Sequence, residues 1–188
     1  KAVKEIIMKK CKSCLLPETY ETIEFNENGC NICNGASFKN KGIDWDKRKR
    51  ELDKLIEKYK GKYSYDCIVP FSGGKDSTFT LYYLIKNYGI KPLVVRFNHG
   101  FMRKIVRENN EKTFKKLGVD VIDFTPNWNV VKLLMKESFD RKTDFCWHCH
   151  TGIFSYPIRT ALIHKVPLIL WGETQSEITA YYQFEDEE

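Results

Sequence analysis

The sequence predicts an α/β fold: a parallel sheet with helices on both faces, preceded by a small cysteine-rich unit. Three observations lead to this expectation. From residue 66 onward, short apolar runs alternate with amphipathic stretches, and apolar strands separated by helices are typical of parallel sheets buried on both faces. Two Cys-x-x-Cys pairs lie near the start of the chain, and a glycine-rich segment, SGGKDS, follows the first apolar run at 72–77.

The alternation of apolar and amphipathic segments gives the expected order of elements. Strands are expected at 66–71, 91–97, 119–124 and 167–171. Helices are expected at 44–59, 78–87, 103–117, 130–139 and 152–164. Parallel strands joined in this way require right-handed crossovers. We therefore divide the chain into a unit at 1–43 and an α/β domain at 44–188, and we expect the domain to be truncated at its C-terminus because no closing element follows the fourth strand.

Composition narrows the class of protein. The apolar share of 42% suits a globular core. No apolar stretch approaches the roughly 20 residues of a membrane span, and the first twelve residues contain no signal-peptide core, so we expect a cytoplasmic protein. The net charge of +6 suits a polyanionic partner but does not choose between nucleic acid and a phosphorylated small molecule.

The first two cysteine pairs predict a metal site. Cys11 and Cys14 are separated by fifteen residues from Cys30 and Cys33, a spacing typical of zinc ribbons. An alternating run at 20–25 and a turn at 26–29 lie between the pairs. So small a unit has almost no apolar core and needs a Zn²⁺ ion to fold. An iron–sulfur cluster, or reduced thiols without metal, are the alternatives.

The third cysteine pair has no single interpretation. Cys146 and Cys149 stand in the string FCWHCHTG, between two expected helices. They could bind a second metal ion or cluster, act as redox or nucleophilic thiols, or pack at the edge of a substrate site. Cys67, inside the first strand, is expected to be a core residue.

The glycine-rich segment predicts a phosphate site. Its place between a strand and a helix allows backbone N–H groups and the helix N-terminus to face an anion, and the glycines let the anion approach closely. Hydroxyls of Ser72 and Ser77 can donate hydrogen bonds, and Lys75 can place a positive charge on the phosphates. Asp76 can orient Mg²⁺ or cap the helix.

SGGKDS resembles the pyrophosphatase (PP) loop of the N-type ATP pyrophosphatases, whose fold is similar to that of adenine nucleotide α-hydrolases. The resemblance implies that ATP is cut between its α and β phosphates to activate a substrate oxygen, with Mg²⁺ as a cofactor and Lys75 and Asp76 as the catalytic residues. It also implies contacts to adenosine from 96–99, after the second strand, and at 172–173, after the fourth. The ATP-binding residues expected on this basis are Phe71, Ser72, Gly73, Gly74, Lys75, Asp76, Ser77, Phe97, Asn98 and Gly172.

Several segments along nearly the whole chain are similar to a narrower family, the N-acetyl sugar amidotransferases of O-antigen lipopolysaccharide and flagellin-glycan synthesis. They are CKSCLLP (11–17), 25–33, PFSGGKDS (70–77), NHG (98–100), FCWHCHTG (145–152) and LWGE (170–173). The resemblance implies that ATP adenylates the amide oxygen of an N-acetyl group and that ammonia displaces AMP to leave an acetamidino group. A nucleotide-linked or phosphorylated sugar would be the substrate, and a partner glutaminase would supply the ammonia.

Two other functions fit part of the sequence. A tRNA thiolase uses the same adenylation chemistry with a sulfur donor, and some such enzymes hold a [4Fe–4S] cluster on a Cys-x-x-Cys pair and a third, later cysteine. No cysteine follows Cys149 in this sequence. A zinc-ribbon interaction module on an inactive scaffold is the non-enzymatic alternative. His99 and Glu173 are open between a role in proton transfer and ordinary roles in a turn and at a helix start.

Overall fold

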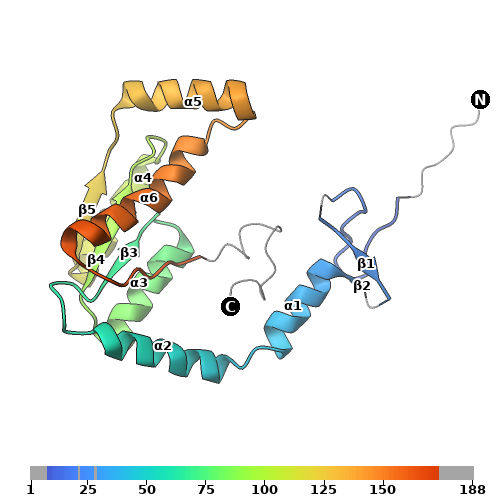
Figure 1. Cartoon of the computed structure of the whole chain (residues 1–188), viewed down its shortest axis with the longest axis horizontal. Helices are drawn as coiled ribbons and strands as arrows, with labels where there is room; N and C mark the ends of the chain where they lie inside the picture. Colours follow the sequence, from blue (N-terminus) through green and yellow to red (C-terminus); the bar gives the residue numbers. More distant parts are fainter. Residues whose placement is uncertain (1–7, 21, 28, 174–188) are drawn as a thin grey trace, which may run out of the picture. The chain divides into compact units, whose positions relative to one another are not determined.

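The computed structural model describes residues 8–20, 22–27 and 29–173. The chain divides into two compact units, and their described parts are residues 8–51 and 52–173. The boundary falls within helix α2 (Trp45–Tyr59), which is therefore shared by the two units (Figure 1). Among the described residues, no helix combines the length and the apolar character that crossing a membrane requires.

The first unit consists of two short strands and a helix. Strand β1 (Phe25–Asn26) pairs antiparallel with β2 (Gly29–Cys30), and helix α1 (Asn31–Lys41) follows directly. Of the described residues in the alternating run at 20–25, only Phe25 lies in a strand. The second cysteine pair is not in a loop as in a zinc ribbon. Cys33 lies in the first turn of α1. Since Cys30 caps this helix with its side chain, the second pair is held by a helix start.

The second unit contains the predicted parallel sheet. Strands β3 (Cys67–Pro70), β4 (Pro92–Phe97) and β5 (Asp120–Phe124) lie in the order β3–β4–β5, all parallel. The crossover helices are α3 (Lys75–Tyr88) and α4 (Lys104–Leu117), followed by α5 (Trp128–Lys142) and α6 (Trp147–His164) (Figure 1). The predicted α/β class is confirmed, with three strands in the sheet and six helices in the described parts of the chain.

The fourth expected strand, 167–171, is reduced to an isolated parallel bridge between Ile68 and Ile169. Two backbone hydrogen bonds hold it, from Ile68 N to Leu168 O (2.8 Å) and from Leu170 N to Ile68 O (2.9 Å). Pro167 has no N–H to extend the ladder, and the chain bends at Gly172. The segment nevertheless occupies the position of a strand beside β3, so its carboxyl end reaches the same edge of the sheet as the ends of β3 and β4.

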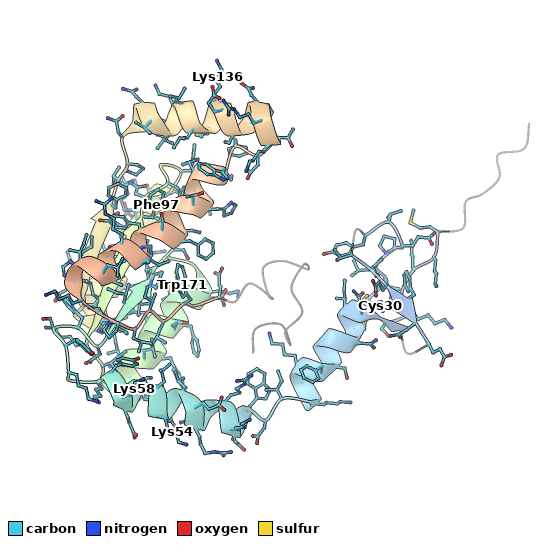
Figure 2. The ribbon with its side chains drawn as sticks, viewed as in Figure 1. Cys30, Lys54, Lys58, Phe97, Lys136 and Trp171 are labelled. Carbon is cyan, nitrogen blue, oxygen red and sulfur yellow. The ribbon has the colours of Figure 1, made fainter. Side chains whose placement is uncertain are left out.

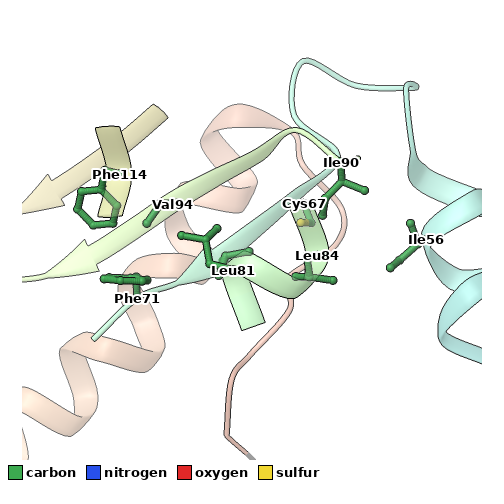
Figure 3. Packing of buried hydrophobic residues seen from close by; sticks show 9 residues of the cluster. Ile56, Cys67, Phe71, Leu81, Leu84, Ile90, Val94 and Phe114 are labelled. Carbon is green, nitrogen blue, oxygen red and sulfur yellow. The ribbon is translucent and has the colours of Figure 1, made fainter. Parts of the chain in front are cut away.

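The core lies on both faces of the sheet, as the strand sequences predict. On one face Cys67, Val69 and Val94 pack against helices α2, α3 and α4 (Figure 3). On the other face Ile68, Leu93 and Val95 pack against α6. Alternate residues of β3 therefore enter opposite core layers, which is the period-2 pattern of a strand buried on both sides.

Leu81 tests this packing, because its side chain on α3 is fully buried in the first core layer. We expect Leu81→Ala to lower the free energy of unfolding by about 2–5 kcal/mol, since the substitution leaves a cavity. Chemical denaturation measures the change. Tyr82→Ala, at the exposed neighbouring position, is the control and should change the stability by less than about 1 kcal/mol. Equal losses in the two variants would contradict the assignment of the buried face.

Candidate functional site

The glycine-rich loop follows the buried end of β3 and enters α3 earlier than expected. Phe71 continues the ladder, because its N–H donates to Val95 O (2.9 Å), and its ring packs edge-on against Phe114. Helix α3 begins at Lys75 rather than at 78, with Gly74 as its N-cap. The last three residues of SGGKDS therefore form the first turn of the helix. No side chain caps this turn, so its backbone N–H groups are available to an anion.

Hydroxyl groups tie the loop to the helix start. Ser72 Oγ lies 3.1 Å from Ser77 Oγ and accepts a hydrogen bond from Gly74 N (3.3 Å). Ser77 Oγ also donates to Gly74 O at 3.3 Å. These contacts fix the two serines beside the N–H groups of the first turn. The structure thus brings Ser72, Gly74 and Ser77 together, and their role in ATP binding stays a prediction.

Lys75 and Asp76 lie on the outer side of the loop. Lys75 Nζ contacts the Asp76 carboxylate at 2.7 Å, and the Lys75 side chain is 89% exposed. Exposed ion pairs are worth about 0–1 kcal/mol, so Lys75 can exchange this carboxylate for a phosphate at little cost. Their proposed catalytic roles stay predictions.

Gly73 has a conformation and surroundings that exclude a side chain. Its φ is +85°, and a Cβ would lie 2.4 Å from Oδ1 of Asn110 on α4. Asn110 is buried and was not anticipated from the sequence. The available signal was its spacing four residues before Phe114, which places an amide on the apolar face of α4.

Gly172, in the segment that follows α6, packs against the end of the glycine-rich loop. A Cβ on Gly172 would lie 3.0 Å from both N and Cα of Ser77. This contact is between two backbones, and it brings the end of the fourth strand-like segment onto the start of α3. The structure therefore places Gly172 beside the glycine-rich loop, and its expected contact with adenosine stays a prediction.

The residues expected to contact adenosine after β4 point in different directions. Phe97 packs on α6, where a Cβ on Gly152 would lie 2.2 Å from its ring, and Figure 2 shows it beside this helix. Asn98 uses its side chain within the loop, donating to Thr125 Oγ1 (3.1 Å) and accepting from Gly100 N (3.1 Å). The structure does not bring Phe97 or Asn98 into hydrogen-bond contact with the glycine-rich loop.

Arg96 faces the α4 side of the sheet. Its guanidinium is buried, pairs with Asp123 and lies 3.6 Å from Glu111. Beside it is a hollow of about 490 Å³ between α4 and β5, lined by Arg96, Glu111, Phe114, Lys115, Gly118, Val119, Asp120, Val121 and Asp123. This hollow contains no residue of the glycine-rich loop, and Arg96 acts there as a structural ion-pair partner.

His99 follows β4, and His148 lies on α6 within range of its charge. His99 Nδ1 accepts from Phe101 N (3.2 Å), and burial, followed by the charge of His148, lowers the pKa of His99. His148 is buried in α6, and its Nδ1 lies 3.2 Å from the carbonyl of Phe145. Because a carbonyl only accepts, Nδ1 carries the proton. Within 8–173, excluding positions 21 and 28, His148 Nε2 has no hydrogen-bond partner.

The third cysteine pair lies at a helix start and not in a loop between helices, as the sequence had suggested. Cys146 is the N-cap of α6, and Cys149 lies in its first turn. Burial, followed by the charge of Cys146, raises the pKa of Cys149. In the part of the chain that the structure describes, no third metal-ligating side chain joins the pair to form a close group. The second metal or cluster site stays a prediction.

The first two pairs form one compact group of thiols. The sulfur atoms of Cys11, Cys14, Cys30 and Cys33 all lie within 4.8 Å of one another. Cys11 Sγ is 3.8 Å from Cys33 Sγ, and Cys14 Sγ is 3.6 Å from Cys30 Sγ. Four cysteine ligands so arranged can bind one metal ion such as Zn²⁺.

The first pair lies on a tight turn. Cys11 N donates to Leu16 O (2.9 Å) and Leu15 N donates to Cys11 O (3.0 Å), with Leu15 at a φ of +62°. Hydrogen bonds from the backbone of Cys14, and then of Ser13, lower the pKa of Cys11 to about 6. The turn thus stabilises the thiolate form, which is the form that binds metal.

Comparison with known proteins gives no family. No family model matches the chain. A protein of Methanocaldococcus jannaschii described as "uncharacterized protein MJ1599" is 28% identical over 167 residues, which cover 87% of this chain and 58% of that protein. The chain thus spans little more than half the length of this relative. The N-acetyl sugar amidotransferase family is not confirmed.

A solved structure from the same organism, described as a "predicted subunit of tRNA methyltransferase", matches with a TM-score of 0.37 and 20% identity. The match covers 64% of this chain and 58% of the other. A likeness of this size supports no conclusion about activity.

Gly73→Ala tests the loop. We expect the variant to lose about 1–2 kcal/mol from the positive φ, a further amount from the collision with Asn110, and at least about tenfold in ATP affinity because the loop must shift. Thermal melts and calorimetric titration measure both effects. Gly118→Ala, with a φ of +65° and open space at the Cβ position, is the control for the φ cost alone. ATP binding unchanged in Gly73→Ala would contradict the assignment.

Metal analysis tests the thiol group. Protein purified without oxygen should contain one zinc per chain. Cys30→Ser should lose the metal and unfold the first unit, because its small core depends on the ion. Cys149→Ser is the control and should keep the zinc. Metal-free wild-type protein would contradict the prediction, and iron with visible absorption would place a cluster on the chain.

Proposed function

We propose that this protein is an ATP pyrophosphatase that adenylates a substrate oxygen. One observation supports this most: the SGGKDS loop leads into the uncapped first turn of α3, and the Gly172 backbone packs against that turn at the carboxyl edge of a parallel sheet. Ligands of open parallel sheets bind at this edge. The backbone N–H groups of the helix start, two hydroxyls and one exposed lysine lie together there.

In this proposal the loop holds the departing pyrophosphate. The substrate oxygen attacks the α phosphorus, the bond from that phosphorus to the bridging oxygen breaks, and pyrophosphate leaves with the bonding electrons. N–H groups of the α3 start, with Ser72 and Ser77, bind the phosphate oxygens, and Lys75 neutralises the charge that develops on the leaving group. Mg²⁺, held through Asp76 and the phosphates, would add further charge neutralisation.

In the sugar amidotransferase hypothesis, adenylation is followed by formation of a C–N bond. The adenylated oxygen is the amide oxygen of an N-acetyl sugar, and ammonia from a partner glutaminase attacks the amide carbon and displaces AMP. Support comes from the sequence segments that resemble that family, two of which, NHG and LWGE, follow β4 and the strand-like segment at one edge of the sheet. His99 and Glu173 are candidates to accept the proton of ammonia.

A tRNA-modifying activity is the second candidate, and an electrostatic observation favours it. Helix α4 exposes five basic side chains against two carboxylates: Lys104, Arg107, Lys112, Lys115 and Lys116 against Glu108 and Glu111. A basic helix beginning at the edge that carries the loop suits a polyanionic substrate such as RNA. Adenylation would then activate a base oxygen for replacement by sulfur.

The test measures AMP and pyrophosphate formed from ATP, with a nucleotide-linked N-acetyl sugar plus ammonium in one series and with tRNA plus a sulfide donor in another. We expect AMP and pyrophosphate in equal amounts in one series. Lys75→Ala should reduce the rate by about 100-fold or more, because transition-state charge loses its partner. Lys86→Ala, in the last turn of the same helix, is the matched control.

The two series separate the candidates. Turnover with tRNA that falls steeply with salt would identify an RNA substrate, and turnover with the sugar and ammonium would identify the amidotransferase. Formation of ADP in place of AMP would contradict the proposal. ATP binding without AMP in either series would favour the inactive interaction module.

A further inference from the structure

An exposed aromatic pair includes Trp171, the residue before Gly172, and neither the loop chemistry nor the core explains it. The rings of Trp171 and Phe154 have centroids 5.2 Å apart and are tilted by 38°. Each residue keeps 38% of its surface exposed. Large aromatic residues stabilise proteins by burying their area, so an accessible pair offers its remaining faces to a ligand.

The alternation of the strand-like segment determines where this pair lies. Leu168 and Leu170 enter the core layer of α3, and Ile169 enters the layer of α6. Trp171 continues on the side of Ile169 and contacts Phe154 of α6. Figure 2 shows Trp171 on the segment that follows α6.

The next residue, Gly172, packs against the start of α3 at the end of the glycine-rich loop. Its Cβ position lies 3.0 Å from Ser77. Consecutive Cα atoms are about 3.8 Å apart. Gly172 alone therefore separates Trp171 along the chain from the contact with the start of α3, the helix start that we assign to phosphate.

A nucleotide has the chemistry that this arrangement recognises. It carries phosphates at one end and a planar base at the other, with a ribose between them. Aromatic side chains bind bases through their faces, with little dependence on which base is bound. A base stacked on the pair and phosphates bound at the loop would place the ribose across Gly172, where no side chain obstructs it.

We propose that Trp171 and Phe154 stack the nucleobase of a nucleotide at the carboxyl edge of the sheet, with its phosphates on residues 72–77. The proposal rests on the phosphate role of the loop given above and adds a site for the base. The base is adenine if the nucleotide is ATP. It is the base of the second substrate if that substrate is linked to a nucleotide.

Calorimetric titration of four ligands separates the base from the phosphates: ATP, AMP, UDP and inorganic pyrophosphate. Trp171→Ala should weaken ATP and AMP by roughly 5- to 150-fold, the range of one lost base–aromatic stack, and leave pyrophosphate unchanged. Trp171→Phe, which keeps an aromatic face, should recover most of the affinity. Trp128→Ala removes another exposed tryptophan, on α5, and should have no effect.

Each outcome has one meaning. Weakened ATP and AMP assign the pair to adenine, and weakened UDP alone assigns it to the base of a nucleotide-linked substrate. Equal binding of every ligand by wild type and Trp171→Ala overturns the proposal while leaving the phosphate loop intact. Binding of AMP that depends on Trp171, without any binding of pyrophosphate, upholds the base site and contradicts the proposed function. Failure of wild-type protein to bind any base-carrying ligand overturns the base site.

Discussion

The second unit depends on the burial of strand β3 on all sides. Its backbone pairs with β4 along one edge and with Ile169 along the other. Its side chains enter two separate core layers, Cys67 and Val69 in one and Ile68 in the other. A strand so enclosed has no freedom to shift its register, because a slip by one residue would exchange the two layers. The loop that follows β3 therefore starts from a fixed point.

From that point, backbone contacts without side chains determine the candidate site. Gly73 passes Asn110 of α4, and Gly172 touches the start of α3 at Ser77. A Cβ at Gly73 would collide with the Asn110 side chain, and a Cβ at Gly172 would lie 3.0 Å from the Ser77 backbone. Glycine at both positions therefore lets these chain segments approach the helix start closely. Trp171, which pairs with Phe154, lies on the same segment, one residue before Gly172.

The two units are stabilised by different physics. The second unit buries aliphatic side chains on both faces of its sheet. The first buries little more than Cys11 and Cys30 in the part that the structure describes, so its own apolar area cannot offset the entropy of ordering its chain. Four convergent thiols supply the missing stabilisation when they bind a metal ion. A tight turn and a helix start hold the two cysteine pairs.

The sequence by itself determined the α/β class, the order of the elements from α2 to α6, the set of four cysteines that could hold a metal ion and the place of the SGGKDS loop after a buried strand. Apolar periodicity and motif spacing are local properties, and they suffice for these features. Only the tertiary structure decided that α3 begins at Lys75, that the fourth strand shrinks to a bridge, and that Cys146 and Cys149 start a helix. It also decided which distant residues touch the loop. Asn110 on α4 and Gly172 after α6 approach it from separate segments, and contacts between segments depend on how the helices pack on the sheet, which no local pattern of residues encodes.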